Sequence, residues 1–152
     1  MDPSISRENR AETERIRDLA GRLSLEELRL PLGEGWTVGA ALAHLAFWDR
    51  RALVLLTRWK DRGPSPSEAD TDVINDSILP LCLAIEPDKA AELAVQAAEA
   101  IDRALEGVSP DLAREIERLG SLKLRRFEHR RKHREEIEKA VASASAGAGG
   151  AA

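Results

Sequence analysis

The sequence predicts an all-α protein that folds as a four-helix bundle, and two observations carry this prediction. Apolar residues recur at helical spacing in several long segments, whereas the alternation of apolar and polar residues that marks a strand is nearly absent. Prolines, glycines and helix-capping residues separate these segments from one another. Long helices with such breaks between them are typical of an antiparallel or crossover bundle.

The first part of the chain predicts two long helices with a short one between them. Residues 4–22 form a charged helix with one apolar stripe. Ser24 and Glu27 match a capping box at the start of a short helical turn. One proline and two glycines then break the chain within residues 31–35. A long helix over residues 37–60 follows, with its threonine as N-cap, and its apolar first half predicts the most buried helix.

The second part of the chain predicts a loop and four more helices. The helices are expected over residues 71–85, 87–106, 109–120 and 121–142. Pro80 is expected to interrupt the first of them, and Pro87 suits the first turn of the second. The tail of small residues at 143–152 cannot bury enough surface to offset the entropy of ordering, so we expect disorder there. The folded domain is therefore predicted to span residues 1–142.

The composition fits a single domain and is consistent with a reducing compartment. Of the 152 residues, 43% are hydrophobic and 33% are charged, which suffices for a core. The net charge of −4 implies no general attraction to nucleic acid or to an anionic membrane. Cys82 is the only cysteine, which excludes an internal disulfide, and its apolar neighbours predict an inert core thiol. We find no signal peptide and no apolar stretch of membrane-spanning length, so we expect a cytoplasmic protein.

The three histidines of the chain are the candidate metal ligands. His129 and His133 are four residues apart in a predicted helix, so their rings lie on one face. His44 lies in the most apolar stretch, where a buried ring needs a partner. Three imidazoles without a nearby cysteine leave a fourth position open, as in catalytic metal sites. A solvated helix face or a core histidine bonded to a backbone carbonyl explains each histidine singly, but a shared metal ion explains all three.

Two charged residues flank the histidine pair on the same predicted helix face. Glu136 could hold the outer ring nitrogen of a histidine or act as a base. Arg126 could bind an anionic group of a substrate. Pairing of both side chains with neighbouring surface charges is an equally good interpretation.

Further candidates for the site come from the apolar segments. Trp48 lies four residues after His44 and could form a wall of a substrate pocket, although a tryptophan on such a helix is more often part of the core. Asn75 either caps its helix or points into the site. The basic segment from Lys123 to Arg134 could contact phosphates, but the net acidity and the lack of interleaved aromatic residues argue against nucleic acid as the main partner.

Three motifs, GEGWTVGAALAHLAFWDRR, DTDVINDSI and HRRKHREEIEKA, resemble the DinB/YfiT-like superfamily. Within it, the chain is most similar to the metal-binding domain of mycothiol-dependent maleylpyruvate isomerases, over about residues 10–142. The resemblance implies a four-helix bundle with a crossover topology, frequently a homodimer. It also implies a divalent metal ion, commonly zinc or nickel, held by His44, His129 and His133.

The resemblance further implies the kinds of reaction known in the family. These are thiol transfer with mycothiol or bacillithiol, isomerisation of maleylpyruvate and metal-dependent hydrolysis. We expect a small-molecule substrate and either thiol transfer, with a low-molecular-weight thiol as co-substrate, or hydrolysis. The metal would lower the pKa of a bound water or thiol and so create a nucleophile near neutral pH.

Two considerations bear on this functional prediction. Only the small-residue tail follows the last predicted helix, so we do not expect the additional C-terminal domain of the isomerases, which argues against that activity. The alternative is a bundle without catalytic activity that binds a small molecule or serves in a stress response, with a structural metal or none. An open coordination position that faces a pocket would favour the enzyme.

Overall fold

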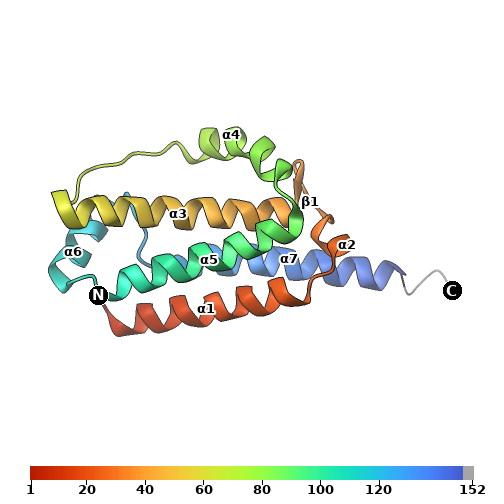
Figure 1. The fold of residues 1–152 in the computed structure, drawn as a ribbon, viewed down its shortest axis with the longest axis horizontal. Helices are drawn as coiled ribbons and strands as arrows, with labels where there is room; N and C mark the ends of the chain where they lie inside the picture. The colour runs from red at the N-terminus through yellow and green to blue at the C-terminus, as the bar shows by residue number, and fades with distance from the viewer. Residues whose placement is uncertain (149–152) are drawn as a thin grey trace.

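The computed structural model describes residues 1–148, and its secondary structure is almost entirely helical, which confirms the all-α prediction (Figure 1). The four long helices are α1 (Pro3–Arg22), α3 (Val38–Arg62), α5 (Pro87–Glu106) and α7 (Arg126–Ala148). The shorter helices are α2 (Leu25–Leu28), α4 (Thr71–Ala84) and α6 (Pro110–Leu119). A small hairpin of β1 (Pro31–Gly33) and β2 (Trp36–Thr37) precedes α3.

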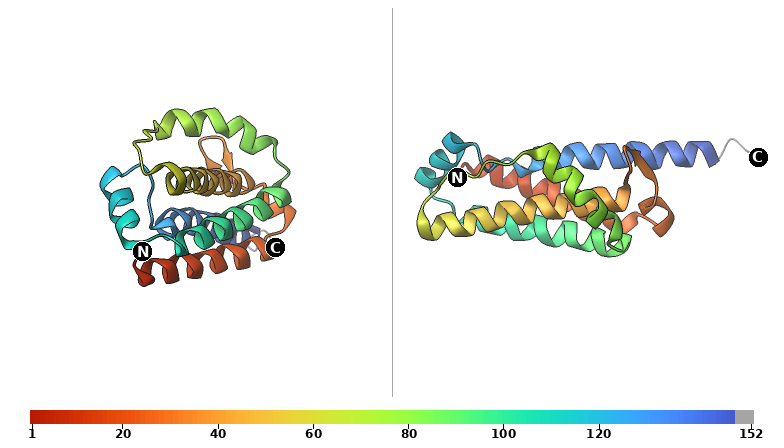
Figure 2. Two further views of the ribbon diagram at one scale, coloured as in Figure 1. Left: turned by 60° about the vertical axis from the view of Figure 1, so that its left-hand side comes forward. Right: turned by 90° about the horizontal axis from the view of Figure 1, so that it is seen from above.

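The four long helices lie side by side, and each packs against two of the others (Figures 1 and 2). Helices α1 and α7 run in one direction, and α3 and α5 run in the other (Figure 1). Helix α3 packs on both α5 and α7, and α1 packs on the same two helices. Because α3 and α5 are parallel, the chain must return between them, and α4 carries it back across the outside of α3 (Figure 2).

The start of α3 agrees with the sequence prediction, although the hairpin before it was not predicted. The oxygen Oγ1 of Thr37 accepts a hydrogen bond of 3.2 Å from the amide of Ala40, as expected of an N-cap. The turn of the hairpin needs left-handed backbone, with φ of 97° at Gly33 and 82° at Gly35. Strands this short show no periodicity in a sequence, so only the break itself could be predicted.

Helix α4 is continuous through Pro80, contrary to the predicted interruption. A proline removes one backbone hydrogen bond and leaves a carbonyl one turn earlier without its partner. Pro80 and Asp76 both lie on the exposed side of α4, where water can satisfy that carbonyl. The cost of the proline is therefore small enough for the helix to persist.

Helix α7 begins at Arg126, later than the predicted start at Ser121, and its cap explains the difference. The side chain of Asn9, in α1, donates to the carbonyl of Leu124 at 2.9 Å and accepts from the amide of Phe127 at 2.9 Å. Asn9 thus satisfies backbone groups at the start of a helix that is distant in sequence. A cap supplied by another helix leaves no local sequence signal.

The other end of α7 also differs from the predicted boundary, because the helix continues past Ala142 to Ala148. Part of the 143–152 tail, for which we expected disorder, is therefore helical, whereas the domain boundary at residue 142 stays a prediction. Alanine has the highest helix propensity, so an alanine-rich segment readily extends a helix that is already formed. The disorder predicted for residues 149–152 concerns a segment outside the described residues.

The apolar core has two parts along the long helices. One lies at the hairpin end and includes Leu42 and Ile137, and the other lies near α6 and includes Trp59 and Ile116. Cys82 is buried in the first part, and burial raises the pKa of its thiol, which fits an unreactive side chain. No helix within residues 1–148 is both long enough and apolar enough to cross a membrane.

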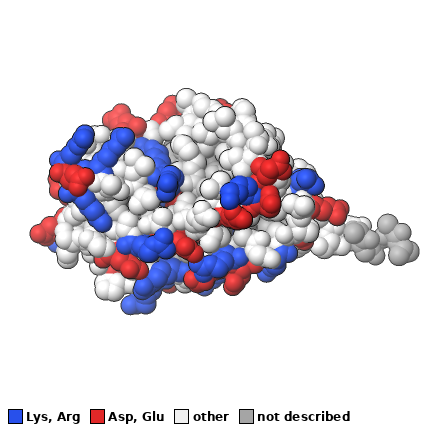
Figure 3. Space-filling view, viewed as in Figure 1, with Lys and Arg blue, Asp and Glu red and all other residues white. Residues whose placement is uncertain are grey.

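Charge is unevenly distributed over the surface. On the face shown in Figure 3, charged side chains of both signs line the part of the molecule over α1, and the area over α4 is mostly uncharged. Exposed Phe47 and Leu81 belong to an apolar groove between α3, α4 and α5, with a volume of about 410 Å³.

A buried polar network between the long helices centres on Arg130, which is 1% exposed. Its Nε donates to Oδ2 of Asp49 in α3 at 2.8 Å. Its Nη1 donates to Oγ1 of Thr13 in α1 at 2.8 Å and to Oδ2 of Asp102 in α5 at 3.0 Å. One guanidinium therefore links α7 to the three other long helices. Although burial alone would lower the pKa of Arg130, the two carboxylates raise it, so the side chain is charged.

Replacing Arg130 with methionine should lower the free energy of unfolding by about 3–5 kcal/mol, because Asp49 and Asp102 would stay buried without their cation. Urea denaturation followed by circular dichroism measures this loss. Lys139→Met is the matched control at an exposed position of α7, and it should change the stability by less than about 0.5 kcal/mol. Equal stabilities of the two variants would show that the network does not hold the helices together.

Candidate metal centre

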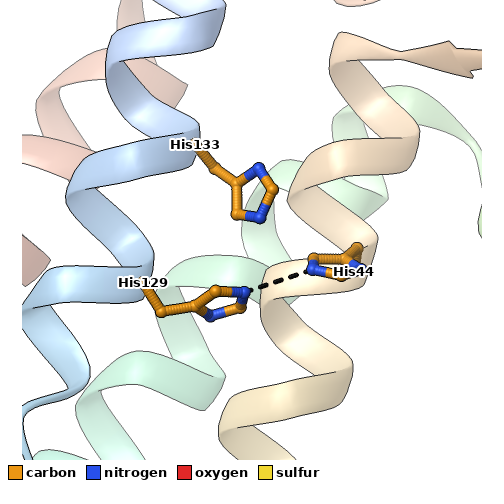
Figure 4. A group of neighbouring side chains, drawn as sticks. All are labelled: His44, His129 and His133. Atoms are coloured by element: carbon orange, nitrogen blue, oxygen red, sulfur yellow. Dashed lines mark hydrogen bonds between the residues drawn. The ribbon is translucent and has the colours of Figure 1, made fainter. Parts of the chain in front are cut away.

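The structure brings the three histidines together at the contact between α3 and α7 (Figure 4). His44 projects from α3, and His129 and His133 project from successive turns near the start of α7 (Figure 4). One nitrogen from each ring lies within 4.8 Å of the others, and the Nε2 atoms of His44 and His129 are 3.2 Å apart. The antiparallel packing of α3 on α7 makes this convergence possible.

The donor atoms fit a single divalent ion. Two nitrogens that each lie about 2.0–2.1 Å from a tetrahedral ion are separated by about 3.3 Å, close to the distance between His44 and His129. The ligand nitrogen of His133 is somewhat further away, within 4.8 Å of the other two. Among the described residues, no cysteine or carboxylate joins the cluster. The set therefore offers three imidazoles and leaves a fourth position of a tetrahedron to an exogenous ligand.

The protonation state of the histidines also suits metal binding. Burial is the main cause that lowers the pKa of His44 to about 4 and that of His129 to about 2. Burial lowers the pKa of His133 as well, although the carboxylate of Glu136 opposes the shift. All three rings are therefore neutral at pH 7, which is the form that binds a metal ion.

Glu136 lies behind His133 rather than among the ligand atoms. Its Oε2 is 2.8 Å from Nδ1 of His133. Because a carboxylate only accepts, Nδ1 carries the proton, and the lone pair of Nε2 is free for a metal ion. This contact is the geometry expected of a carboxylate that orients a metal-binding histidine.

The outer ring nitrogens of the other two histidines lack a strong hydrogen-bond partner. Nδ1 of His44 is buried and has no hydrogen-bond partner among the described residues. Nδ1 of His129 faces Nη2 of Arg126 at 3.5 Å, at the limit of a hydrogen bond. The ring of His44 is instead positioned by packing, edge-on to the ring of Trp36 at 5.3 Å between centroids. Glu136 is thus the one carboxylate, within residues 1–148, that fixes a ring of this cluster.

A cavity of about 440 Å³ opens onto the three histidines, and Trp48 and Asn75 line it. Nε1 of Trp48 donates to Oδ1 of Asn75 at 3.1 Å, so that the two side chains form one wall. Asp70, not Asn75, is the N-cap of α4. Of the two interpretations of Asn75, the structure therefore favours the one in which it faces the site.

Arg126 also lines this cavity, although it is 7% exposed and already has a partner. Its Nε donates to Oδ1 of Asp49 at 2.8 Å. Asp49 and the cavity-lining Lys132 were not identified from the sequence. The only sequence feature that could have pointed to Asp49 is its position as an acidic residue next to the apolar part of a helix. Lys132 could not be distinguished from the other basic residues of its segment.

The comparisons with known proteins agree with this site in part. The family model that matches the chain is the mycothiol maleylpyruvate isomerase N-terminal domain, over residues 9–123. The chain belongs to this DinB/YfiT-like family. The match includes His44 but ends before α7, so the contribution of His129 and His133 rests on the structure. No curated protein and no solved structure matches the chain significantly.

Glu136→Gln should weaken zinc binding by about 10–100-fold, because loss of the carboxylate leaves His133 less basic and less well oriented. Competition with a chromogenic chelator measures the zinc dissociation constant. Glu135→Gln removes the same charge from the adjacent, exposed position and should leave the constant unchanged. Equal constants for the two variants would exclude the orienting role of Glu136.

Proposed function

We propose that this protein is a divalent-metal-dependent enzyme in which His44, His129 and His133 hold the ion in a four-helix bundle of DinB/YfiT-like topology. The reaction is thiol transfer, with a thiol of the mycothiol or bacillithiol type, or hydrolysis. One observation carries the proposal: three neutral imidazoles converge at the edge of a cavity that can admit a fourth ligand. Zinc and nickel are both compatible with imidazole ligands.

When bound, the metal ion would act as a Lewis acid and lower the pKa of a thiol or water that it coordinates. The side chains around it have separate roles in this proposal. Trp48, held by Asn75, offers an aromatic wall against which a substrate can be oriented. Because Asp49 compensates the charge of Arg126, the positive potential of the cavity comes mainly from Lys123 and Lys132, and it attracts an anionic substrate or a thiolate. Glu136 keeps the ring of His133 in its metal-binding orientation.

Two observations support an enzyme over a binding module without turnover. A purely structural metal site would be closed by a fourth protein ligand, and Glu136 contacts the outer nitrogen of His133 instead. Trp48 forms a wall of the cavity and leaves the histidines accessible to it. The preference for thiol chemistry comes from the family. The small-molecule substrate, the homodimer and the cytoplasmic location stay predictions.

The zinc- or nickel-loaded protein should accelerate the reaction of a low-molecular-weight thiol with an electrophilic test substrate, or the hydrolysis of an activated ester. His133→Ala should reduce this rate by at least roughly 100-fold, because the ion and the nucleophile that it activates are lost. Thiol consumption and ester cleavage, measured with mycothiol and bacillithiol, test the two reactions separately.

The metal-free wild-type protein is the control for this experiment, and it should be as inactive as the variant. A metal-loaded protein that binds thiols but turns over neither kind of substrate would favour the non-catalytic alternative.

A further inference from the structure

A second cavity, of about 400 Å³, adjoins the one that contains the histidines. Trp48, Lys123 and Arg126 line both cavities, so the two lie next to each other along these side chains. The second cavity extends from there to Arg51 in α3 and to Ser67 in the loop before α4. A small molecule bound at the histidines could therefore reach into a second, chemically different environment.

Arg51 is a partly buried cation without an anionic partner. Its guanidinium lies over the ring of Trp48 at 5.6 Å from the centroid. Its Nη2 donates to the carbonyl and to the hydroxyl of Ser67, both at 3.2 Å, and these partners are neutral. Within residues 1–148, no carboxylate lies within 4.0 Å of Arg51. The position of its charge is fixed, but the charge is not compensated.

The other charges around the second cavity strengthen this imbalance. The lining contains three cations, Arg51, Lys123 and Arg126, and one carboxylate, Glu68. Arg126 is compensated by Asp49, whereas Lys123 forms no ion pair within the described part of the chain. Burial, together with the charge of Arg126, lowers the pKa of Arg51. An oxyanion in this cavity would provide this cation with a partner.

We propose that the second cavity binds the anionic end, a carboxylate or a phosphate, of the small molecule whose other end reaches the metal ligands. Arg51 and Lys123 contact the oxyanion, and the middle of the ligand lies along Trp48. The substrate is then an extended, negatively charged molecule with a metal-binding atom at its far end. The metal-binding end rests on the proposed function, whereas the oxyanion site rests on Arg51 and Lys123 and requires no metal.

Isothermal titration calorimetry of the metal-free protein tests the oxyanion site by itself, with 6-mercaptohexanoate and the uncharged 6-mercaptohexanol as probes. The carboxylate should bind, and the alcohol should bind at least about tenfold more weakly, because its hydroxyl carries no negative charge to pair with the two cations. Arg51→Gln should weaken binding of the carboxylate by about tenfold. Arg50→Gln, at the adjacent exposed position that faces the apolar groove, should not change it.

Lys123→Gln is a second variant, at an exposed position where folding is not at risk, and it should also weaken carboxylate binding. Equal binding of the two probes, equal binding by the Arg51 and Arg50 variants, or no binding at millimolar concentrations would overturn the proposal. Competition by acetate and by inorganic phosphate identifies the preferred oxyanion.

Repeating the titration with the zinc-loaded protein separates this inference from the proposed function. Zinc should tighten the binding of both thiols to the same degree. If zinc does not change the affinity for the thiols but Arg51→Gln still weakens carboxylate binding, the proposed metal-dependent function is wrong and the oxyanion site is supported.

Discussion

The site depends on the bidentate contact of Asp49 with two arginines of α7. One carboxylate oxygen accepts from Arg126 and the other from Arg130, each at 2.8 Å. These arginines lie on either side of His129 in the sequence, and Asp49 lies little more than one helical turn after His44. The contact therefore sets the register of α7 against α3 and places His129 opposite His44. Asp102 and Thr13, through Arg130, add the other two long helices to the same point.

The same arrangement determines the electrostatics of the cavity. The histidines are neutral, and the cations Arg126 and Lys132 face the same space. Cations near a metal site repel a divalent ion. Here the carboxylate of Asp49 compensates the charge of Arg126. The carboxylate of Glu136 contacts the outer ring nitrogen of His133 and adds a further negative charge near the site. The remaining positive potential favours an anionic fourth ligand, such as a thiolate. The fold thus positions the three histidines and also favours a negatively charged fourth ligand of the metal ion.

The sequence predicted the features that depend on local spacing, including the pair His129 and His133, the Thr37 cap and most helix boundaries. It placed His44 with these two histidines, but it did not predict the polar contacts that pair other distant segments, because neither partner has a local signal. Asn9 caps α7 from α1, and Asp49 pairs with Arg130 across the molecule. The basic residues of α7 resemble a solvated helix face in the sequence, although Arg130 is 1% exposed.

The central claim is that the three histidines bind one divalent ion. Metal content by mass spectrometry tests it most directly, on protein purified without a histidine tag and on His129→Ala prepared in the same way. The account predicts about one zinc or nickel ion per chain in the wild-type protein and loss of the ion in the variant. Full retention of the metal by the variant, or no metal in either protein after divalent ions are added, would contradict it.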